Sequence, residues 1–273
     1  YVANLRIARY YWNWTRMKNR RSSLKYFDMM VRSLLAYFLV GLLGAVCAFP
    51  CLVVAALPER LRLNNRVYLW FAGLFYRGVV FATMLRVTVV GRQHLEQECA
   101  IVVANHQSAL DIPFVGALLG THPHVWLVLE HYARVPIFGF LIRRMAIVVD
   151  QSNVASRSHS MLKTLRYANN CQGHIIIFPE GGRYLEGRPQ RFMNGFALLA
   201  HKTGLPVIPV YLKNLNDVYP PYSFFIRAKP IKVIVGEPVT PSDEETAAQF
   251  GQRVYDWYLT HIEQEKSHDA VID

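Results

Sequence analysis

The feature that most constrains this chain is an uncharged, apolar segment near its beginning. From Ser33 to Pro58 the sequence contains no Asp, Glu, Lys or Arg. A helix of about 20 apolar residues is long enough to cross the hydrocarbon core of a bilayer. Thirty-two residues precede the segment, which does not fit the short apolar core of a cleavable signal peptide. The sequence therefore predicts a membrane-embedded helix in this region.

A second apolar segment, from Val67 to Leu85, is interrupted by Arg77. A charged side chain is costly at the bilayer centre, so Arg77 favours an interfacial or re-entrant position. Two arrangements remain open: one span followed by an embedded helix, or a hairpin within one leaflet. Basic residues flank the first segment on both sides, which weakens any orientation rule based on charge.

The basic composition fits a partner that carries negative charge. The net charge is +11, 52% of the residues are hydrophobic, and the pI is about 9.6. Anionic lipids and nucleic acids would both suit this charge. We find no zinc-finger spacing, RNA-binding aromatic signature or P-loop, so we expect a membrane partner and no nucleic acid. Tyr10, Tyr11, Trp12 and Trp14 lie among basic residues and predict an interfacial anchor, with a disordered tail as the alternative.

After the apolar segments, strand-like and helix-like runs alternate along the chain. This alternation predicts an α/β domain with a single mixed sheet over residues 86–273, after a membrane-anchoring region over residues 1–85. No internal repeat or low-complexity linker divides the domain. The expected strands are 85–90, 100–104, 125–129, 146–149, 175–178, 207–212 and 231–235, and the expected helices are 109–119, 154–169, 190–203 and 243–265.

The first polar motif, from Asn105 to Asp111, follows the expected strand 100–104. An Asp can orient one imidazole nitrogen of His106 and leave the other free to accept a proton. On one helix, five residues would place the two side chains about 140° apart, so we expect His106 to precede the helix that contains Asp111. A polar turn residue and a first-turn acid would give the same pattern without any chemistry.

The second motif, from Glu180 to Arg183, follows the expected strand 175–178. Arg183 can bind a phosphate through its planar guanidinium, and Gly181 and Gly182 allow backbone amides to approach an anion. Glu180 can orient Arg183 or an acceptor hydroxyl. Because ligands usually bind at the carboxyl ends of the strands in open α/β sheets, both motifs are expected to form one site.

Together, the two motifs resemble those of the glycerolipid acyltransferase superfamily, which includes 1-acylglycerol-3-phosphate acyltransferases. The family's first motif is N-H-x-x-x-x-D and its third is F-P-E-G-x-R, and both occur here in order. Val135–Gly139 matches the second-motif region and Leu205–Val210 the fourth, so the resemblance covers roughly residues 85–239.

The resemblance implies transfer of an acyl group from acyl-CoA or acyl carrier protein to the sn-2 hydroxyl of 1-acylglycerol 3-phosphate, giving phosphatidate. His106 would be the general base and Asp111 its orienting partner, with no covalent acyl-enzyme. The implied substrate-binding residues are Asn105, Glu180, Gly181, Gly182 and Arg183. The reaction needs no metal or cofactor, since the acyl thioester is a co-substrate. Because acyl thioesters are cytosolic, we expect a hairpin in one leaflet with the catalytic domain facing the cytoplasm.

Several positions depart from the family pattern and keep other functions open. The family's usual Lys, Glu, Arg, Thr and later basic residue are replaced by Leu129, His131, Gln151, Gly182 and Met193–Asn194. Arg143, Arg144, Arg188 and Arg191 are nearby in sequence and are candidates to compensate. A different lysolipid acceptor and a non-catalytic lipid-binding protein therefore remain as alternatives.

The cysteines and the remaining histidines show no spacing typical of a zinc site. We expect Cys47, Cys51, Cys99 and Cys171 to be reduced and unpaired. His122, His124 and His131 are expected to lie in loops or at the surface, and no metal site is predicted.

Overall fold

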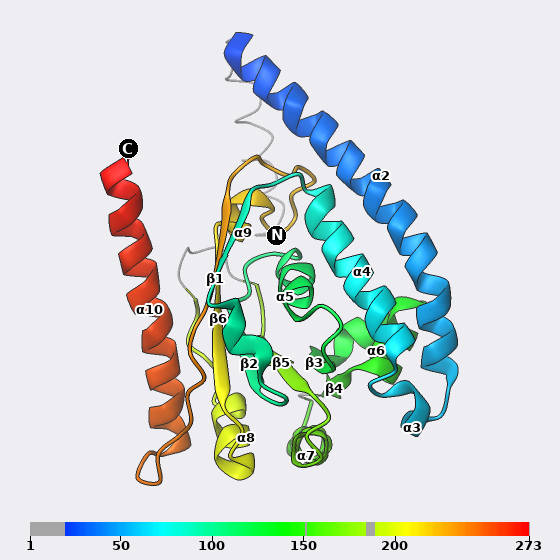
Figure 1. Cartoon of the computed structure of the whole chain (residues 1–273), viewed down its shortest axis with the longest axis vertical. Coiled ribbons are helices and arrows are strands. Elements are labelled where there is room, and N and C mark those ends of the chain that lie inside the picture. The colour runs from blue at the N-terminus through cyan, green and yellow to red at the C-terminus, as the bar shows by residue number, and fades with distance from the viewer. Residues whose placement is uncertain (1–19, 151, 184–188, 273) are drawn as a thin grey trace.

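The structure is a computed structural model that describes residues 20–150, 152–183 and 189–272. Its centre is a mixed sheet, which in the described part of the chain has seven strands in the order β1-β7-β6-β2-β5-β3-β4. β6 and β7 pair antiparallel, and the other neighbouring strands pair parallel. The predicted α/β fold with a single mixed sheet is confirmed (Figure 1). The basic aromatic stretch 10–14 lies outside the described residues.

The strands alternate with helices along most of the chain. The strands are β1 (Val87–Val90), β2 (Ile101–Ala104), β3 (His124–Leu129), β4 (Ile147–Val149), β5 (His174–Ile177), β6 (Val207–Lys213) and β7 (Ile231–Val235). The helices are α2 (Arg20–Ala56), α3 (Glu59–Arg62), α4 (Arg66–Ala82), α5 (Asp111–Leu119), α6 (Phe138–Met145), α7 (Val154–Asn169), α8 (Gly195–Thr203), α9 (Leu215–Val218) and α10 (Ala247–Ile272), with short 3-10 helices at Arg92–Glu96 and Glu130–Arg134.

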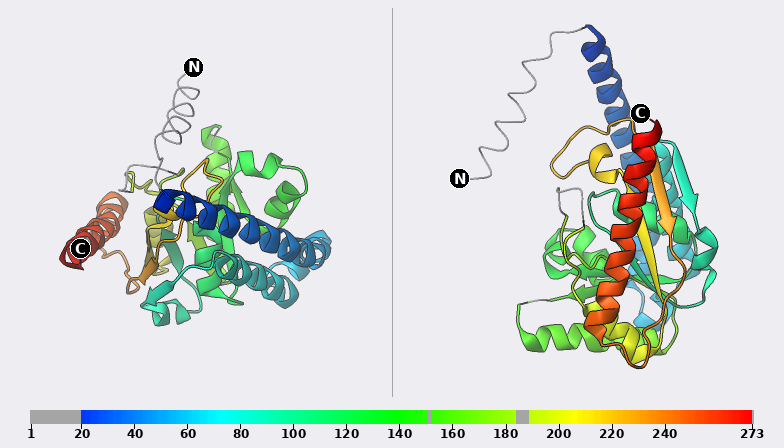
Figure 2. Two further views of the ribbon diagram at one scale, coloured as in Figure 1. Left: turned by 90° about the horizontal axis from the view of Figure 1, so that it is seen from above. Right: turned by 90° about the vertical axis from the view of Figure 1, so that its left-hand side faces the viewer.

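The central strand β2 shows how the sheet supports two cores. Successive side chains of a strand point to opposite faces, so Val102 and Ala104 pack on one side and Ile101 and Val103 on the other. The first face is covered by α2, α4 and α5, and the second by α7, α8 and α10. Figure 2 shows α10 standing on the side of the sheet away from α2 and α4. Because β2 is buried on both faces, its carboxyl end is held rigidly.

All seven expected strands are present, with ends shifted by at most two residues. Helix α7 has the predicted bounds, whereas α5 and α8 start later than expected and α10 runs further. Helix α6 was not among the expected helices. It is short and follows Pro136 and Ile137, the latter with a positive φ of 61°, so the local sequence gave a turn signal rather than a helix signal.

The two apolar segments form a helical pair, α2 and α4, which lie side by side in Figures 1 and 2. Gly78 permits the close approach, since a Cβ there would lie 2.1 Å from Cδ2 of Leu43. Helix α2 is long and apolar enough to cross a membrane between Lys25 and Ala56. Its inner face, however, packs along α4 and α6. The side chains buried on this face are Ser33, Ala36, Cys47, Cys51, Val54 and Ala55.

The outer face of α2 is a continuous apolar stripe. Its exposed side chains recur at spacings of three and four residues, as expected for one face of a helix. They are Phe27, Val31, Leu34, Leu35, Phe38, Leu42, Val46, Phe49 and Val53. A helix that packs on protein along one side and exposes apolar side chains along the other indicates membrane association. The boundary at residue 85 stays a prediction; α4 ends at Ala82 and β1 begins at Val87.

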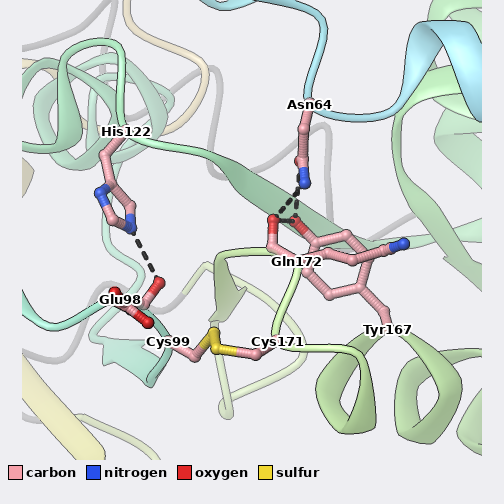
Figure 3. Close-up of a disulfide and its surroundings, with 7 residues drawn as sticks. All are labelled: Asn64, Glu98, Cys99, His122, Tyr167, Cys171 and Gln172. Atoms are coloured by element: carbon pink, nitrogen blue, oxygen red, sulfur yellow. Dashed lines mark hydrogen bonds between the residues drawn. A yellow bond between two sulfur atoms is a disulfide. The ribbon is translucent and has the colours of Figure 1, made fainter.

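The expectation that all four cysteines are unpaired is wrong for two of them. Cys99 and Cys171 form a disulfide, with their Cα atoms 5.6 Å apart (Figure 3). The reason is topological: Cys99 precedes β2 and Cys171 precedes β5, and these strands are parallel neighbours with Ile101 opposite Ile175. Their amino ends therefore meet, although 72 positions separate the two cysteines in sequence. Cys47 and Cys51 are free, as predicted.

Candidate active site

The site is formed where β2 and β5 end side by side. His106 lies in the loop after β2, and Asp111 is the first residue of α5, as the spacing argument predicted. The His106 Nδ1 and Asp111 Oδ2 atoms are 2.8 Å apart. With the Nδ1 proton donated to Asp111, the lone pair is on Nε2, which has no hydrogen-bond partner among the described residues. The geometry is that of a base with its orienting carboxylate.

Asp111 is fully buried, and one of its oxygens carries all its hydrogen bonds. Besides His106, the backbone N–H groups of Gln107 and Ser108 donate to Oδ2 at 2.5 and 2.8 Å. The other oxygen, Oδ1, is buried without a hydrogen-bond partner in the described structure. Burial raises the pKa of the Asp111 carboxyl, and the donors from His106, Ser108 and Gln107 oppose that rise. The loop from His106 to Ser108 thus wraps around a single carboxylate oxygen.

The imidazole of His106 is also held by an aromatic ring that sequence reasoning did not assign. The His106 ring stacks on Phe178, with centroids 4.2 Å apart and an interplanar angle of 16°. Phe178 in turn stacks on Trp126 of β3. Phe178 directly precedes the second motif, so its position after a buried strand was the available signal. Its ring fixes the plane of the imidazole while Asp111 fixes the rotation within that plane.

Glu180 connects the two motif loops. Its Oε1 accepts a hydrogen bond from the His106 backbone N–H at 2.7 Å, and its Oε2 accepts one from Gln190 at 3.0 Å. Burial raises the pKa of Glu180 to about 7, against the lowering effect of these two amides. The structure thus places Glu180 as a support for the backbone of the base. Its predicted contact with substrate stays a prediction.

Asn105 is buried and braces the sheet. Its Nδ2 donates to the carbonyl of Leu212 at 3.1 Å, and its Oδ1 accepts from the Leu212 N–H at 2.7 Å. Both polar atoms of the amide are therefore already bonded to β6. This pairing fixes the point at which the chain leaves β2, one residue before His106. A contact between Asn105 and substrate remains untested.

Arg183 and the two glycines lie at the other side of the site. Arg183 is exposed, and its Nη2 donates to the Tyr132 hydroxyl at 3.2 Å. Gly181 has φ +66° and a Cβ there would lie 2.6 Å from Cε of Met193, so this position requires glycine. The Gly181 N–H donates to the Phe178 carbonyl and closes the turn.

A cavity of about 380 Å³ opens beside the first motif. Ala109, between His106 and Asp111, lines it together with Arg183. The rest of its wall was not foreseen from sequence and consists of Tyr37 of α2 and the segment Tyr219–Phe224. Tyr37 and Tyr219 are 182 positions apart, so no local pattern could have joined them. Arg183, with its cationic side chain, and the first motif, through Ala109, thus line the same cavity.

The comparisons with known proteins agree with this geometry. A family model described as Acyltransferase matches residues 86–213. These residues belong to the acyltransferase family. Proteins named 1-acyl-sn-glycerol-3-phosphate acyltransferase match over most of the chain: the one from Limnanthes douglasii is 28% identical, covering 82% of this chain and 80% of that protein. The one from Pseudomonas aeruginosa is 24% identical, covering 87% and 95%. This chain is an acyltransferase.

A solved structure shows the same fold. The 1-acyl-sn-glycerophosphate (LPA) acyltransferase PlsC from Thermotoga maritima superposes with a TM-score of 0.71 at 21% identity, covering 89% of this chain and 98% of that one. The fold of this acyltransferase is that of a known relative over nearly its whole described length.

Two of the arginines proposed to compensate for missing basic residues have other tasks in this acyltransferase. Arg143 donates to the carbonyl of Ala133. Arg144 binds the carbonyls of Ala55 and Leu57 at 2.8 and 2.7 Å, closing the corner after α2. Both are thus engaged by backbone groups. Arg191 is exposed, and Gln151 and Arg188 lie outside the described residues.

The prediction that His124 is a loop or surface residue is wrong. His124 is the first residue of β3 and is buried beside Tyr76 and Trp126. Burial lowers the pKa of His124 to about 4, and it does the same for His174 at the start of β5. Among the described residues there is no group of three or more His, Cys, Asp or Glu side chains arranged to hold a metal ion.

Proposed function

We propose that this acyltransferase transfers a fatty acyl group from an acyl thioester to the sn-2 hydroxyl of 1-acylglycerol 3-phosphate, giving phosphatidate. The observation that carries the proposal is the 2.8 Å contact between His106 Nδ1 and Asp111 Oδ2, which leaves Nε2 directed away from its partner. The names of the relatives support the acceptor. The donor is acyl-CoA or acyl carrier protein, and no metal or cofactor takes part.

The proposed reaction proceeds in one addition and one elimination. His106 Nε2 removes the proton of the acceptor hydroxyl as its oxygen attacks the thioester carbonyl, forming a tetrahedral intermediate. When the intermediate collapses, the C–S bond breaks and the leaving thiolate takes the proton back from the imidazolium. Asp111 stabilises the imidazolium between these steps. A positioned base of this kind typically contributes about 10²–10⁴-fold to the rate.

Arg183 is proposed to bind the phosphate of the acceptor. It lines the cavity beside Ala109, and its exposed guanidinium can form two parallel hydrogen bonds with phosphate oxygens. Gly181 and Gly182 are proposed to contribute backbone donors, with Asn105 and Glu180 acting nearby. Leu129 and Met193 stand where the family usually has basic residues. The alternative acceptor is therefore another lysolipid, one without a free phosphate monoester.

The membrane arrangement follows from the packing of α2. Because α2 is packed against α4 and α6 along one face, crossing a bilayer alone would require it to separate from both helices. We therefore propose that α2, α3 and α4 form a hairpin whose outer stripe enters one leaflet. The catalytic domain is proposed to face the cytoplasm, the compartment of the thioester donors. The Cys99–Cys171 disulfide argues against a cytoplasmic location of the domain, because disulfides persist mainly in oxidising compartments.

The first experiment measures thiol release from a panel of acyl-CoAs in detergent micelles. The acceptor is lysophosphatidate, lysophosphatidylcholine or none, and the protein is compared with His106→Ala. Release that requires lysophosphatidate and falls by at least about 10²-fold in the variant supports the acceptor and the base together. Release without acceptor would identify a thioesterase, and release only with lysophosphatidylcholine would identify the second acceptor. No release from any donor, acyl carrier protein included, would favour a non-catalytic lipid-binding protein.

The side of the membrane is tested separately in intact cells. A membrane-impermeant maleimide is applied before and after reduction, and its reaction with Cys171, the exposed member of the disulfide, is measured. Labelling only after cell permeabilisation, without reductant, supports the cytoplasmic side with a reduced pair. Labelling of intact cells that requires reductant would place the domain outside the cytosol.

A further inference from the structure

The segment Tyr219–Ile226 is unusual for a loop beside an active site because its large aromatic side chains are exposed. Tyr222 is fully exposed, at 103%, and Phe224 and Phe225 are 53% and 37% exposed. Tyr222 also has a positive φ of 65°, a conformation that is unfavourable for a residue with a bulky side chain. No residue of the described structure covers the Tyr222 ring. Strained, exposed aromatic residues are a feature that folding alone does not explain.

This segment is fastened to the apolar helix α2. The Tyr37 hydroxyl donates to the Phe224 carbonyl at 2.8 Å and lies 3.0 Å from the Tyr219 hydroxyl. The Tyr37 and Phe224 rings contact each other with centroids 4.8 Å apart. Further along, the Ile226 N–H donates to Ser33 Oγ at 2.8 Å. The segment with the exposed aromatic rings is therefore held against α2 at Ser33 and Tyr37.

The same segment forms the wall of the cavity beside the catalytic motif. Tyr219 through Phe224 line the cavity together with Arg183 and Ala109. Ser108 Oγ, within the motif, donates to the Tyr219 carbonyl at 2.7 Å. The segment thus has one side on the apolar surface and the other on the site. Figure 2 shows it as the orange loop that projects next to α9, below the start of α2.

We propose that Tyr219–Ile226 is a second lipid-contacting element, which inserts its aromatic rings into the headgroup region and guides a lysolipid from the leaflet into the cavity. Aromatic side chains favour the membrane–water interface, and exposed Arg227 directly follows the segment, where it can contact anionic headgroups. The binding partner of this segment is the surface of an anionic lipid leaflet. The guiding role rests on the proposed function, whereas the membrane contact does not.

The membrane contact is tested with a fluorophore at the tip of the loop. Tyr222→Cys is labelled with a nitrobenzoxadiazole dye and mixed with vesicles of phosphatidylcholine and phosphatidylglycerol, with and without a lipid that carries a nitroxide on its acyl chain. We expect brighter emission on vesicles and quenching by the nitroxide lipid. Val154→Cys on α7, which is 69% exposed at the start of a distant helix, is the matched control and should show neither effect. Equal behaviour at the two positions would overturn the proposal.

The guiding role is tested by kinetics with two forms of the acceptor. Phe225→Ser changes an exposed ring that does not line the cavity. For lysophosphatidate in vesicles we expect KM to rise about tenfold with kcat unchanged, because one interfacial aromatic anchor is lost. For a short-chain lysophosphatidate that is monomeric in water, both constants should stay unchanged.

Equal losses with both acceptors would show a structural defect and remove the guiding role. If the unaltered protein turns over neither acceptor, the proposed function fails, while the fluorescence result still decides whether the segment contacts the membrane.

Discussion

The two ends of the neighbouring strands β2 and β5 are joined in different ways and carry different histidines. At the carboxyl ends, a hydrogen bond from the His106 N–H to Glu180 joins the loops. At the amino ends, the Cys99–Cys171 disulfide joins them covalently. The same pair of strands thus has one end held by a titratable group and the other by a permanent link. The chemistry is expected at the first end.

The histidines at the two ends differ in their partners. His106 has a carboxylate on one ring nitrogen, and its second nitrogen has no hydrogen-bond partner among the described residues. Ala109, three positions further on, lines the cavity. His174 is fully buried, stacks on His122, and bonds only a backbone carbonyl, that of Leu95. Burial lowers the pKa of His174 to about 4, so it stays neutral at physiological pH without any partner to stabilise a charge. We expect His106, and not His174, to act as a base because only His106 has a carboxylate partner.

The largest effect is expected for His106→Ala. Loss of the base should reduce kcat/KM by about 10²–10⁴-fold, with little change in the free energy of unfolding. His122→Gln is the matched control, because His122 stacks on His174 at the amino end of β5, and this variant should keep full activity. Thiol release with lysophosphatidate measures both variants. If His122→Gln lost as much activity as His106→Ala, the contrast between the two ends would fail.

The next largest effect is expected on the free energy of unfolding when the disulfide is removed. Cys99→Ala combined with Cys171→Ser should lower the free energy of unfolding by about 4 kcal/mol, because the link closes a long loop in the unfolded chain. Since the disulfide lies at the end away from His106, kcat should remain unchanged. Denaturation in detergent with and without reductant measures the change, and the double variant should not respond to reductant. A loss of kcat without a loss of stability would contradict this assignment.

Asp111→Asn tests how the carboxylate acts on the base. All three recorded donors bind Oδ2, and Oδ1 has no partner in the described structure, so an amide oxygen can replace Oδ2 without turning the imidazole. The remaining loss is that of the negative charge beside the imidazolium, and we expect kcat to fall by about 10²-fold. Asp111→Ala, which also removes the orientation, should fall further. Equal losses in the two variants would mean that charge contributes nothing beyond orientation.

The sequence predicted the strands well because β-branched and apolar runs mark them directly. Ile175–Ile177 and Val207–Val210, for example, are continuous apolar runs typical of strands buried on both faces. It also predicted that His106 precedes α5, because that conclusion follows from helix geometry alone. The polar residues at strand ends were predicted as one site because parallel strands bring their carboxyl ends together.

Apart from the short helix α6, the features that were missed depend on contacts between distant segments. The disulfide required the knowledge that β2 and β5 are neighbours, which strand runs do not give. The burial of His124 depends on Tyr76 and Trp126 packing around it. The cavity wall depends on Tyr37 of α2 reaching the segment after α9. In each case the residue types were visible, but the pairing was set by the tertiary fold.

Glu180→Gln is expected to have the smallest effect. It tests how much the hydrogen bond between the carboxyl ends of β2 and β5 contributes to activity. The amide of Gln can accept from only one of the two backbone N–H groups, of His106 and Gln190, that bond the carboxylate. Losing one such bond should cost roughly 1–2 kcal/mol and lower kcat about tenfold. Glu263→Gln, an exposed position on α10, should leave kcat unchanged.

The pH dependence of stability gives a second readout for Glu180. Burial raises its pKa in the folded state from 4.5 to about 7, so between these values the folded protein binds more protons than the unfolded chain. The contribution of Glu180 to stability is therefore fully present below about pH 4.5 and is lost as the pH rises through about 7. Glu180→Gln has no proton to release and should lack this decline, which denaturation curves between these pH values measure. An unchanged pH slope in the variant would show that Glu180 is ionised throughout this range, and that the two amide donors outweigh its burial.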